Sequence, residues 1–229
     1  MDVPRRYLGG LQIFALLVVA ASAQPADAPV RKIAFTVFAT EPGEHVAYVP
    51  YPGATPVPLA FFPTARSPHY LHRGPETMHF YDSVTGEPVA SVAVPPAIRT
   101  ALFIFTANDA PESERYRVQV VDEDMARSPP GTLRILNLSG LQLTGTINRR
   151  QVALREGLNG PMRVGASASV LLRTPFRDRS YQAYAETIPL GASGRGLLLL
   201  LPPYRRGALE VQSRVLLDSP ATVPREQRN

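Results

Sequence analysis

The stretch Thr100-Ala-Leu-Phe-Ile-Phe105 is matched 96 residues later by Gly196-Leu-Leu-Leu-Leu-Leu201. Downstream of each run, Val120-Val121-Asp122 and Leu216-Leu217-Asp218 repeat the same spacing. Other matches keep this order along the chain, and the spacing grows by about ten residues before position 183. The order predicts a tandem duplication of one β-domain of about 90 residues, with an insertion in the second copy around residues 173–180.

Most of the remaining chain is patterned as short strands. Lys32 to Ala39 is apolar on both alternating sides, which predicts a strand covered on both faces. Residues 115–122 alternate between apolar and polar side chains, which is typical of a half-buried antiparallel strand. Asn148 to Gly157 is the one segment with helical character, although a strand is favoured over a helix there. The other expected strands are 46–51, 57–62, 77–82, 89–94, 101–106, 132–138, 141–147, 168–173, 181–188, 196–201 and 208–218.

The pattern predicts an all-β protein with two tandem antiparallel β-sandwich domains of the Ig-like or Greek-key kind. A single larger sandwich or barrel is the alternative. The chain has 24 prolines, which leave little room for long helices, and no cysteine, so packing alone must build the core. The expected division is a signal peptide at 1–23, an acidic domain at 30–124, a linker at 125–131, a basic domain at 132–218 and a loose tail at 219–229.

The first 23 residues have the three parts of a secretory signal peptide. Arg5 and Arg6 form a basic start, Leu11 to Ala20 is an apolar run, and Ala21-Ser22-Ala23 is a small-residue cleavage site. The pair Arg5-Arg6 also fits a twin-arginine signal. The apolar region is shorter than the roughly 20 residues of a spanning helix, so cleavage is favoured over a membrane anchor. We therefore expect export to the periplasm, cell surface or medium, with no stable membrane span after cleavage.

Charge is divided unevenly along the chain. Residues 30–126 carry a net charge of −4 and residues 127–229 a net charge of +9. Arginine suits bidentate capture of carboxylate or phosphate groups, so the densest basic region is a candidate anion-binding or partner-binding surface, although a solvated face explains it as well. Its members are Arg149, Arg150, Arg155, Arg163, Arg173, Arg177 and Arg179.

A second candidate site is the proline-rich loop at 50–58. Four nearby tyrosines offer a possible rim for a glycan or peptide, although such rings often pack at strand ends instead. They are Tyr48, Tyr51, Tyr70 and Tyr81.

Neither a metal site nor a cofactor is expected. His69, His72 and His79 lie at spacings that do not converge on one face of a strand. The acids Asp122 to Asp124 suit calcium by type, but a structural role at a strand end explains them more simply.

No residues are selected as catalytic. Gly165-Ala166-Ser167-Ala168-Ser169 lacks the second glycine of a nucleophile elbow, and no carboxylate pair stands out. No nucleic-acid-binding motif is present. The sequence favours an exported non-enzymatic binding or scaffolding protein of the cell envelope, with a protein or envelope component as partner and an undefined oligomeric state. The alternative is a periplasmic hydrolase with a site between the domains.

The layout resembles exported bacterial proteins that carry a signal peptide and tandem β-sandwich domains. The string Arg134-Ile-Leu-Asn-Leu-Ser139 is similar to the strand that opens certain surface-protein domains. The resemblance implies the fold and the compartment, and it implies no catalytic or binding residue.

Overall fold

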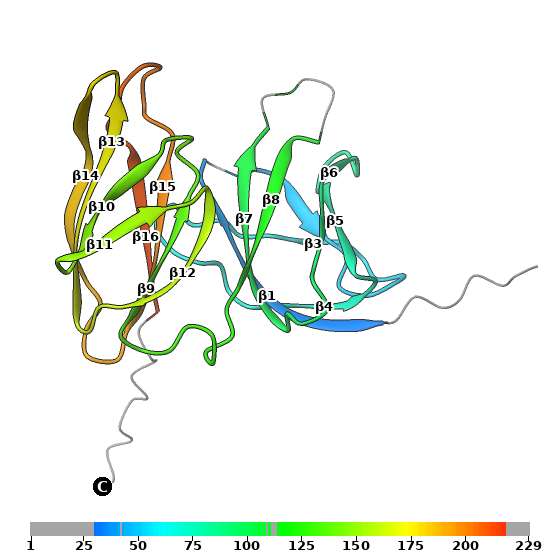
Figure 1. Ribbon diagram of the computed structural model, residues 1–229. Helices are drawn as coiled ribbons and strands as arrows, with labels where there is room; N and C mark the ends of the chain where they lie inside the picture. Colours follow the sequence, from blue (N-terminus) through cyan, green and yellow to red (C-terminus); the bar gives the residue numbers. More distant parts are fainter. Residues whose placement is uncertain (1–29, 42, 109, 111–113, 219–229) are drawn as a thin grey trace, which may run out of the picture.

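The computed structural model describes residues 30–41, 43–108, 110 and 114–218. These residues form sixteen β-strands in four sheets of four strands each, and none of them is helical. The proposed signal peptide and the proposed tail lie outside the described residues. The structure therefore confirms the all-β class and is consistent with two β-sandwiches (Figure 1).

Strands β1 to β8 form the first sandwich and β9 to β16 the second. The first contains β1 (Arg31–Ala39), β2 (Val46–Tyr48), β3 (Val57–Pro58), β4 (Tyr70–Gly74), β5 (Thr77–Asp82), β6 (Pro88–Ala93), β7 (Thr100–Ala107) and β8 (Tyr116–Asp122). The second contains β9 (Thr132–Asn137), β10 (Leu143–Ile147), β11 (Arg150–Leu154), β12 (Gly157–Arg163), β13 (Ser167–Phe176), β14 (Arg179–Pro189), β15 (Arg195–Leu201) and β16 (Gln212–Asp218).

The two sandwiches share one topology. The sheets of the first have the orders β4-β1-β7-β8 and β3-β2-β5-β6, and those of the second have β12-β9-β15-β16 and β11-β10-β13-β14. Adding eight to each strand number converts one set into the other, which supports the expected duplication. Each sandwich has one parallel pair, β1 with β7 and β9 with β15, while the other neighbouring strands are antiparallel.

The register differs by one residue from the expected spacing of 96. Leu102 pairs with Val121 in the first sandwich, and Leu197 pairs with Leu216 in the second. All four side chains face the same apolar cluster between the sandwiches, so Leu102 corresponds to Leu197, not to Leu198. A strand alternates its faces at every residue, so a shift of one residue would turn core side chains outward.

Alternation along the central strands separates three cores. Phe103 and Phe105 of β7 belong to the core of the first sandwich, whereas Leu102 and Ile104 face the second sandwich. Strand β15 does the same, with Leu198 and Leu200 in its own core and its other leucines in the cluster between the sandwiches. The four sheets therefore form consecutive layers, and β1 is covered on both faces as its sequence predicts.

The β5–β6 turn is held by Asp82, whose side chain is 7% exposed. One carboxylate oxygen accepts hydrogen bonds from the backbone N–H groups of Val84 and Thr85, at 2.9 and 3.1 Å. The other oxygen lies 2.9 Å from a guanidinium nitrogen of Arg115. The two backbone hydrogen bonds, followed by Arg115, lower the pKa of Asp82 to about 2.

We expect this turn to contribute to acid sensitivity. Because the pKa of Asp82 is lower in the folded protein than in the unfolded chain, the unfolded chain binds the proton first as the pH falls. The stability that Asp82 contributes should be present above pH ~4 and lost toward pH ~2. Urea midpoints measured across this range should fall less steeply for Asp82→Asn than for the unmodified protein. Equal slopes would show that Asp82 is not a source of the acid sensitivity.

Candidate functional site

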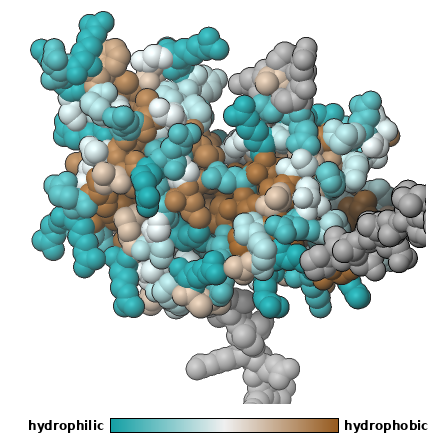
Figure 2. Space-filling model, turned by 45° about the vertical axis from the view of Figure 1, so that its right-hand side comes forward, coloured by the Kyte–Doolittle hydropathy of each residue, from teal (hydrophilic) through white to brown (hydrophobic). Residues whose placement is uncertain are grey.

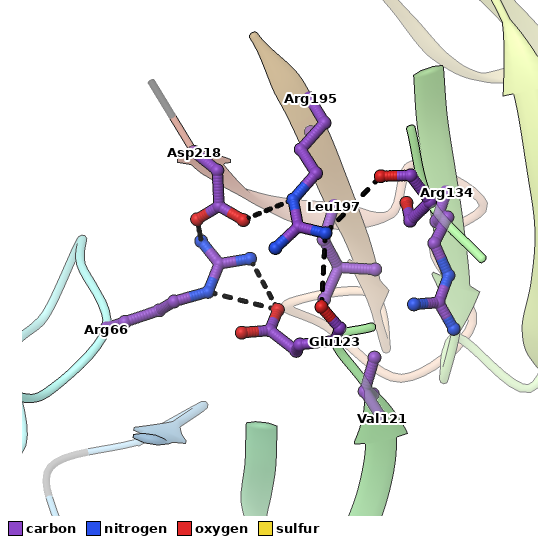
Figure 3. A pocket seen from close by; sticks show the side chains of 9 residues that line it. Arg66, Val121, Glu123, Arg134, Arg195, Leu197 and Asp218 are labelled. Atoms are coloured by element: carbon purple, nitrogen blue, oxygen red, sulfur yellow. Dashed lines mark hydrogen bonds and ion pairs between the residues drawn. The ribbon is translucent and has the colours of Figure 1, made fainter. Parts of the chain in front are cut away.

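A group of charged side chains lies where one end of the first sandwich meets the second (Figure 3). Arg66 comes from the segment before β4, Glu123 directly follows β8, Arg195 begins β15 and Asp218 ends β16. The antiparallel pairing of β15 with β16 sets Arg195 opposite Asp218. We call these four residues the junction network.

The junction network joins the two sandwiches through a continuous series of ion pairs. Arg66 lies 2.9 Å from Oε1 of Glu123 and 2.9 Å from Oδ1 of Asp218. Arg195 lies 2.7 Å from Oδ2 of Asp218 and also donates to the backbone oxygens of Glu123 and Ser128, at 3.2 and 3.3 Å. The side chains of Arg66 and Glu123 are only 14% and 10% exposed, so water screens their attraction weakly.

Arg134 of β9 lies beside the network and adds positive charge. Its Nη1 donates to the backbone oxygen of Asp122, and its buried Nε has no hydrogen-bond partner among the described residues. Burial lowers the pKa of Arg134, while the nearby Glu123 and Asp122 act in the opposite direction. The site therefore holds more guanidinium groups than the two network carboxylates neutralise.

We expect Arg66→Gln to lower the free energy of unfolding by about 2 kcal/mol, because the substitution leaves two poorly exposed carboxylates without their shared cation. Arg127→Gln is a matched control. Arg127 is 56% exposed and makes one ion pair, with Asp122 at 2.6 Å, so its loss should cost about 0–1 kcal/mol. Denaturant unfolding measures the free energy of unfolding of both variants. An equal decrease for Arg66→Gln and Arg127→Gln would contradict a special role of the junction network.

A cavity of about 370 Å³ opens over the junction network. Ser67, His69 and Ser193 line it together with Arg66, Arg195, Glu123 and Asp218. The Ser67 hydroxyl is already engaged, because it accepts from Val37 N and donates to Pro68 O, both at 2.8 Å. The carboxylates of Glu123 and Asp218 are paired with arginines, so neither they nor Ser67 is free to act, whereas His69 and Ser193 also line the cavity.

A larger groove of about 690 Å³ lies at the opposite end of the contact between the sandwiches. Its walls come from the ends of β7 and β15, whereas the junction network lies at the beginnings of the same strands. Glu41, Glu156 and Arg117 are its charged residues, and none of the described residues that line it is a serine or histidine.

The predicted arginine patch is divided by the structure into separate groups. Arg149 and Arg150 lie at the β10–β11 turn, and Arg163 ends β12 close by, where Asn148 donates to Val164 O at 2.9 Å. The second group, Arg173, Arg177 and Arg179, occupies the β13–β14 hairpin toward its tip. Arg155 follows β11 at the far edge of that sheet.

The four predicted tyrosines also separate. Tyr48 is 4% exposed and packs with Tyr70 at a ring-centroid distance of 5.5 Å, so both belong to the core of the first sandwich. Tyr51 and Tyr81 line a cavity of about 110 Å³ together with His72 and His79. Two tyrosines of the proposed rim therefore meet, and they meet beside two histidines.

Sequence reasoning missed the junction network except for its acids at the ends of repeated strands. Arg134 in the middle of the apolar segment 132–137 is a signal that was available, because a charge inside a buried strand needs partners. Arg195 directly before a leucine run is a second signal of the same kind. No sequence signal points to Arg66, because only the tertiary structure brings its loop to the junction.

The chain matches no known family model and no curated protein. Among the described residues, no helix is long and apolar enough to cross a membrane. The same part of the chain holds no group of three or more histidine, aspartate or glutamate side chains placed to bind a metal ion. The fold and the site thus describe an all-β protein of sandwich architecture.

Proposed function

We propose that this chain is an exported, non-enzymatic binding or scaffolding protein of the bacterial cell envelope. The export part rests on the sequence of residues 1–23. The binding part rests on one observation, which is the β13–β14 hairpin of the second sandwich. We infer that this hairpin docks an acidic partner protein.

The hairpin is longer than its counterpart in the first sandwich. β13 and β14 have 10 and 11 residues, whereas β5 and β6 have 6 each. The additional residues lie in the region where the repeat spacing predicts an insertion. In Figure 1 the hairpin rises at the upper left, and β14 is the edge strand of its sheet. An edge strand leaves backbone groups free to pair with an added strand.

The tip of the hairpin combines exposed rings with arginines. Phe176 and Tyr181 are 46% and 40% exposed, and their ring centroids are 6.4 Å apart. The guanidinium of Arg177 lies 5.3 Å from the centroid of the Phe176 ring. Aromatic and arginine side chains are the residues that most often dominate binding energy in protein interfaces. With Arg173 and Arg179 nearby, the tip favours an acidic partner.

In the view of Figure 2, hydrophilic residues cover most of the outer parts of the molecule, while hydrophobic residues gather along its middle. Phe176 and Tyr181 place two neighbouring exposed rings at the end of the hairpin, where a partner can cover both.

The test is a photo-cross-linking amino acid placed at position 176 in the native cells. We expect it to capture one protein at near-stoichiometric yield, and capture should fall at least tenfold when Arg173, Arg177 and Arg179 are changed to glutamate. Position 84 is the matched control, because Val84 is 74% exposed at the β5–β6 turn of the first sandwich. Equal capture from both positions, or no capture at 176, would contradict the proposal.

A periplasmic hydrolase is the second candidate, favoured by the cavity that His69 and Ser193 line together with Glu123 and Asp218. A screen with ester, amide and glycoside substrates tests it. Turnover that disappears in His69→Ala, at unchanged thermal stability, would replace the binding proposal with a hydrolase.

A further inference from the structure

The two sandwiches carry opposite net charges, and their outer sheets lie at opposite ends of the molecule. Residues 30–126 have a net charge of −4 and residues 127–229 a net charge of +9. The outer sheet of the first sandwich is β3-β2-β5-β6, that of the second is β11-β10-β13-β14, and the other two sheets lie between them (Figure 1). The basic β13–β14 hairpin therefore cannot reach the outer sheet of its own acidic sandwich, whereas it can reach that of a second copy.

The outer sheet of the first sandwich bears a small cavity that suits one aromatic ring. It measures about 110 Å³ and lies against β5, where Thr77, His79 and Tyr81 alternate with core residues and so face outward. An apolar cavity of roughly 150 Å³ holds one benzene ring, whereas sites for larger ligands have roughly 300 Å³ or more. Tyrosine and proline side chains at positions 51, 52, 75 and 81 give this cavity walls against which a ring can pack.

Glu76 supplies a negative charge beside this cavity. It is exposed and stands between Pro75 and Thr77, which both line the cavity. None of the ion pairs within the described residues includes Glu76. The guanidinium of Arg31 donates to backbone oxygens of residues 94–98, and Arg73 lies on the face of β4 that points away from the core. The carboxylate of Glu76 is therefore open to a cation from another molecule.

The tip of the β13–β14 hairpin offers the complementary groups. Phe176 is 46% exposed, so its ring can enter a cavity on a neighbouring molecule. The guanidinium of Arg177 lies 5.3 Å from the centroid of that ring, and Arg179 pairs with Phe176 across the hairpin. A ring that enters the cavity thus brings two cations with it, and arginine suits bidentate pairing with a carboxylate.

We propose that the acidic partner of the hairpin is a second copy of this chain, with Phe176 in the cavity beside β5 and an arginine of the tip paired with Glu76. This inference rests on the proposed docking by the hairpin and names its partner. The contact joins two different surfaces, so each molecule of a pair still has one free hairpin or one free cavity. The copies therefore assemble head to tail, which lets a single protein build a scaffold.

The test is sedimentation velocity of the purified whole chain over a series of concentrations. The mean mass should rise with concentration beyond that of a dimer. Association should weaken between ionic strengths of about 0.1 M and 1 M, because the Debye length falls from ~10 Å to ~3 Å. A protein that stays monomeric at every concentration would overturn the proposal.

Two triple variants separate docking by the tip from an effect of net charge. Changing Arg173, Arg177 and Arg179 to glutamate should weaken association at least tenfold. The matched control makes the same change of charge at exposed arginines near the β10–β11 turn, at the opposite end of β13, and should weaken it less than threefold. These control positions are Arg149, Arg150 and Arg163. Equal losses in the two variants would contradict the proposed contact.

A mixing experiment tests the head-to-tail geometry. The hairpin is disabled by Phe176→Ala with Arg177→Ala, and the cavity by Glu76→Arg with Thr77→Arg, all at exposed positions where the fold should be retained. Each variant alone should be monomeric, whereas their mixture should form a dimer and nothing larger, because only one contact remains possible. A mixture that stays monomeric would overturn the proposal.

The photo-cross-linker at position 176 separates this inference from the proposed function. Capture of another copy of the chain, at residues 49–52 or 75–81, supports both. Capture of a different protein, lost in the arginine-to-glutamate variant of the tip, overturns the second copy as partner and leaves the docking by the hairpin in place. No capture contradicts both.

Discussion

Leu199→Ala is expected to lower the free energy of unfolding by about 2–5 kcal/mol, the usual range for truncating a buried leucine. Leu199 is fully buried, and it packs in the apolar cluster between the sandwiches rather than in the core of its own sandwich. Both sandwiches contribute to this cluster through β7 and β15, among other strands. We therefore expect urea to unfold both sandwiches of Leu199→Ala in one cooperative transition, with a lower free energy of unfolding than that of the unmodified protein.

Leu217→Ala is the control for this prediction. Leu217 follows Leu216 of the cluster on β16, so it faces the other side of the strand, and it is 45% exposed; its truncation should therefore cost less than about 1 kcal/mol. Small-angle X-ray scattering of Leu199→Ala tests the contact further. Two separate unfolding transitions already present in the unmodified chain would contradict the view that the cluster joins the sandwiches into one unit.

Gly194→Ala is expected to destabilise the protein by about 3 kcal/mol, because the new methyl group has no room. A Cβ at position 194 would stand 1.8 Å from the backbone oxygen of Leu190. That oxygen belongs to the backbone, so a side-chain rotation cannot relieve the clash. The backbone oxygen of Gly194 also accepts a hydrogen bond from the backbone N–H of Gly131, at 2.8 Å. A displacement of the backbone at Gly194 would therefore also disturb the beginning of the second sandwich.

Gly160→Ala is the matched control for this substitution. Nothing lies within 4 Å of a Cβ built at position 160, and this glycine does not have a positive φ. Its replacement should change stability by less than about 1 kcal/mol. Thermal unfolding of the two variants compares the same chemical change in crowded and open surroundings. A similar loss in both would show that backbone entropy, not the Leu190 oxygen, governs the effect.

The two strands that sequence reasoning missed show where local patterns end. β4 contains histidine and arginine, and β12 contains Gly160 and Pro161, so neither resembles an apolar or alternating strand. Both are edge strands that hydrogen-bond to one neighbour, β1 or β9. An edge strand is stabilised by that neighbour, and its own composition is therefore less informative.

The candidate sites show the same division between what the sequence pattern predicts and what only the structure reveals. The sequence pointed to Tyr51 and Tyr81 as parts of a possible rim, and the structure places both at one cavity with His72 and His79. It grouped Tyr48 and Tyr70 with them because they are near in sequence, whereas both pack in the core. Residues that are close in sequence can face opposite sides of a sheet when a turn or a crossover lies between them, so their sequence distance does not show which of them share a face.

The sequence by itself determined the all-β class, the repeated order of strands and the coverage of β1 on both faces. Each depends on alternation, strand length and turn residues, which are local properties that the chain carries wherever it folds. Only the tertiary structure decided what covers the second face of β7 and β15, which is the other sandwich. It alone also brought Arg66 to Asp218, because contacts between distant segments depend on how whole sheets stack.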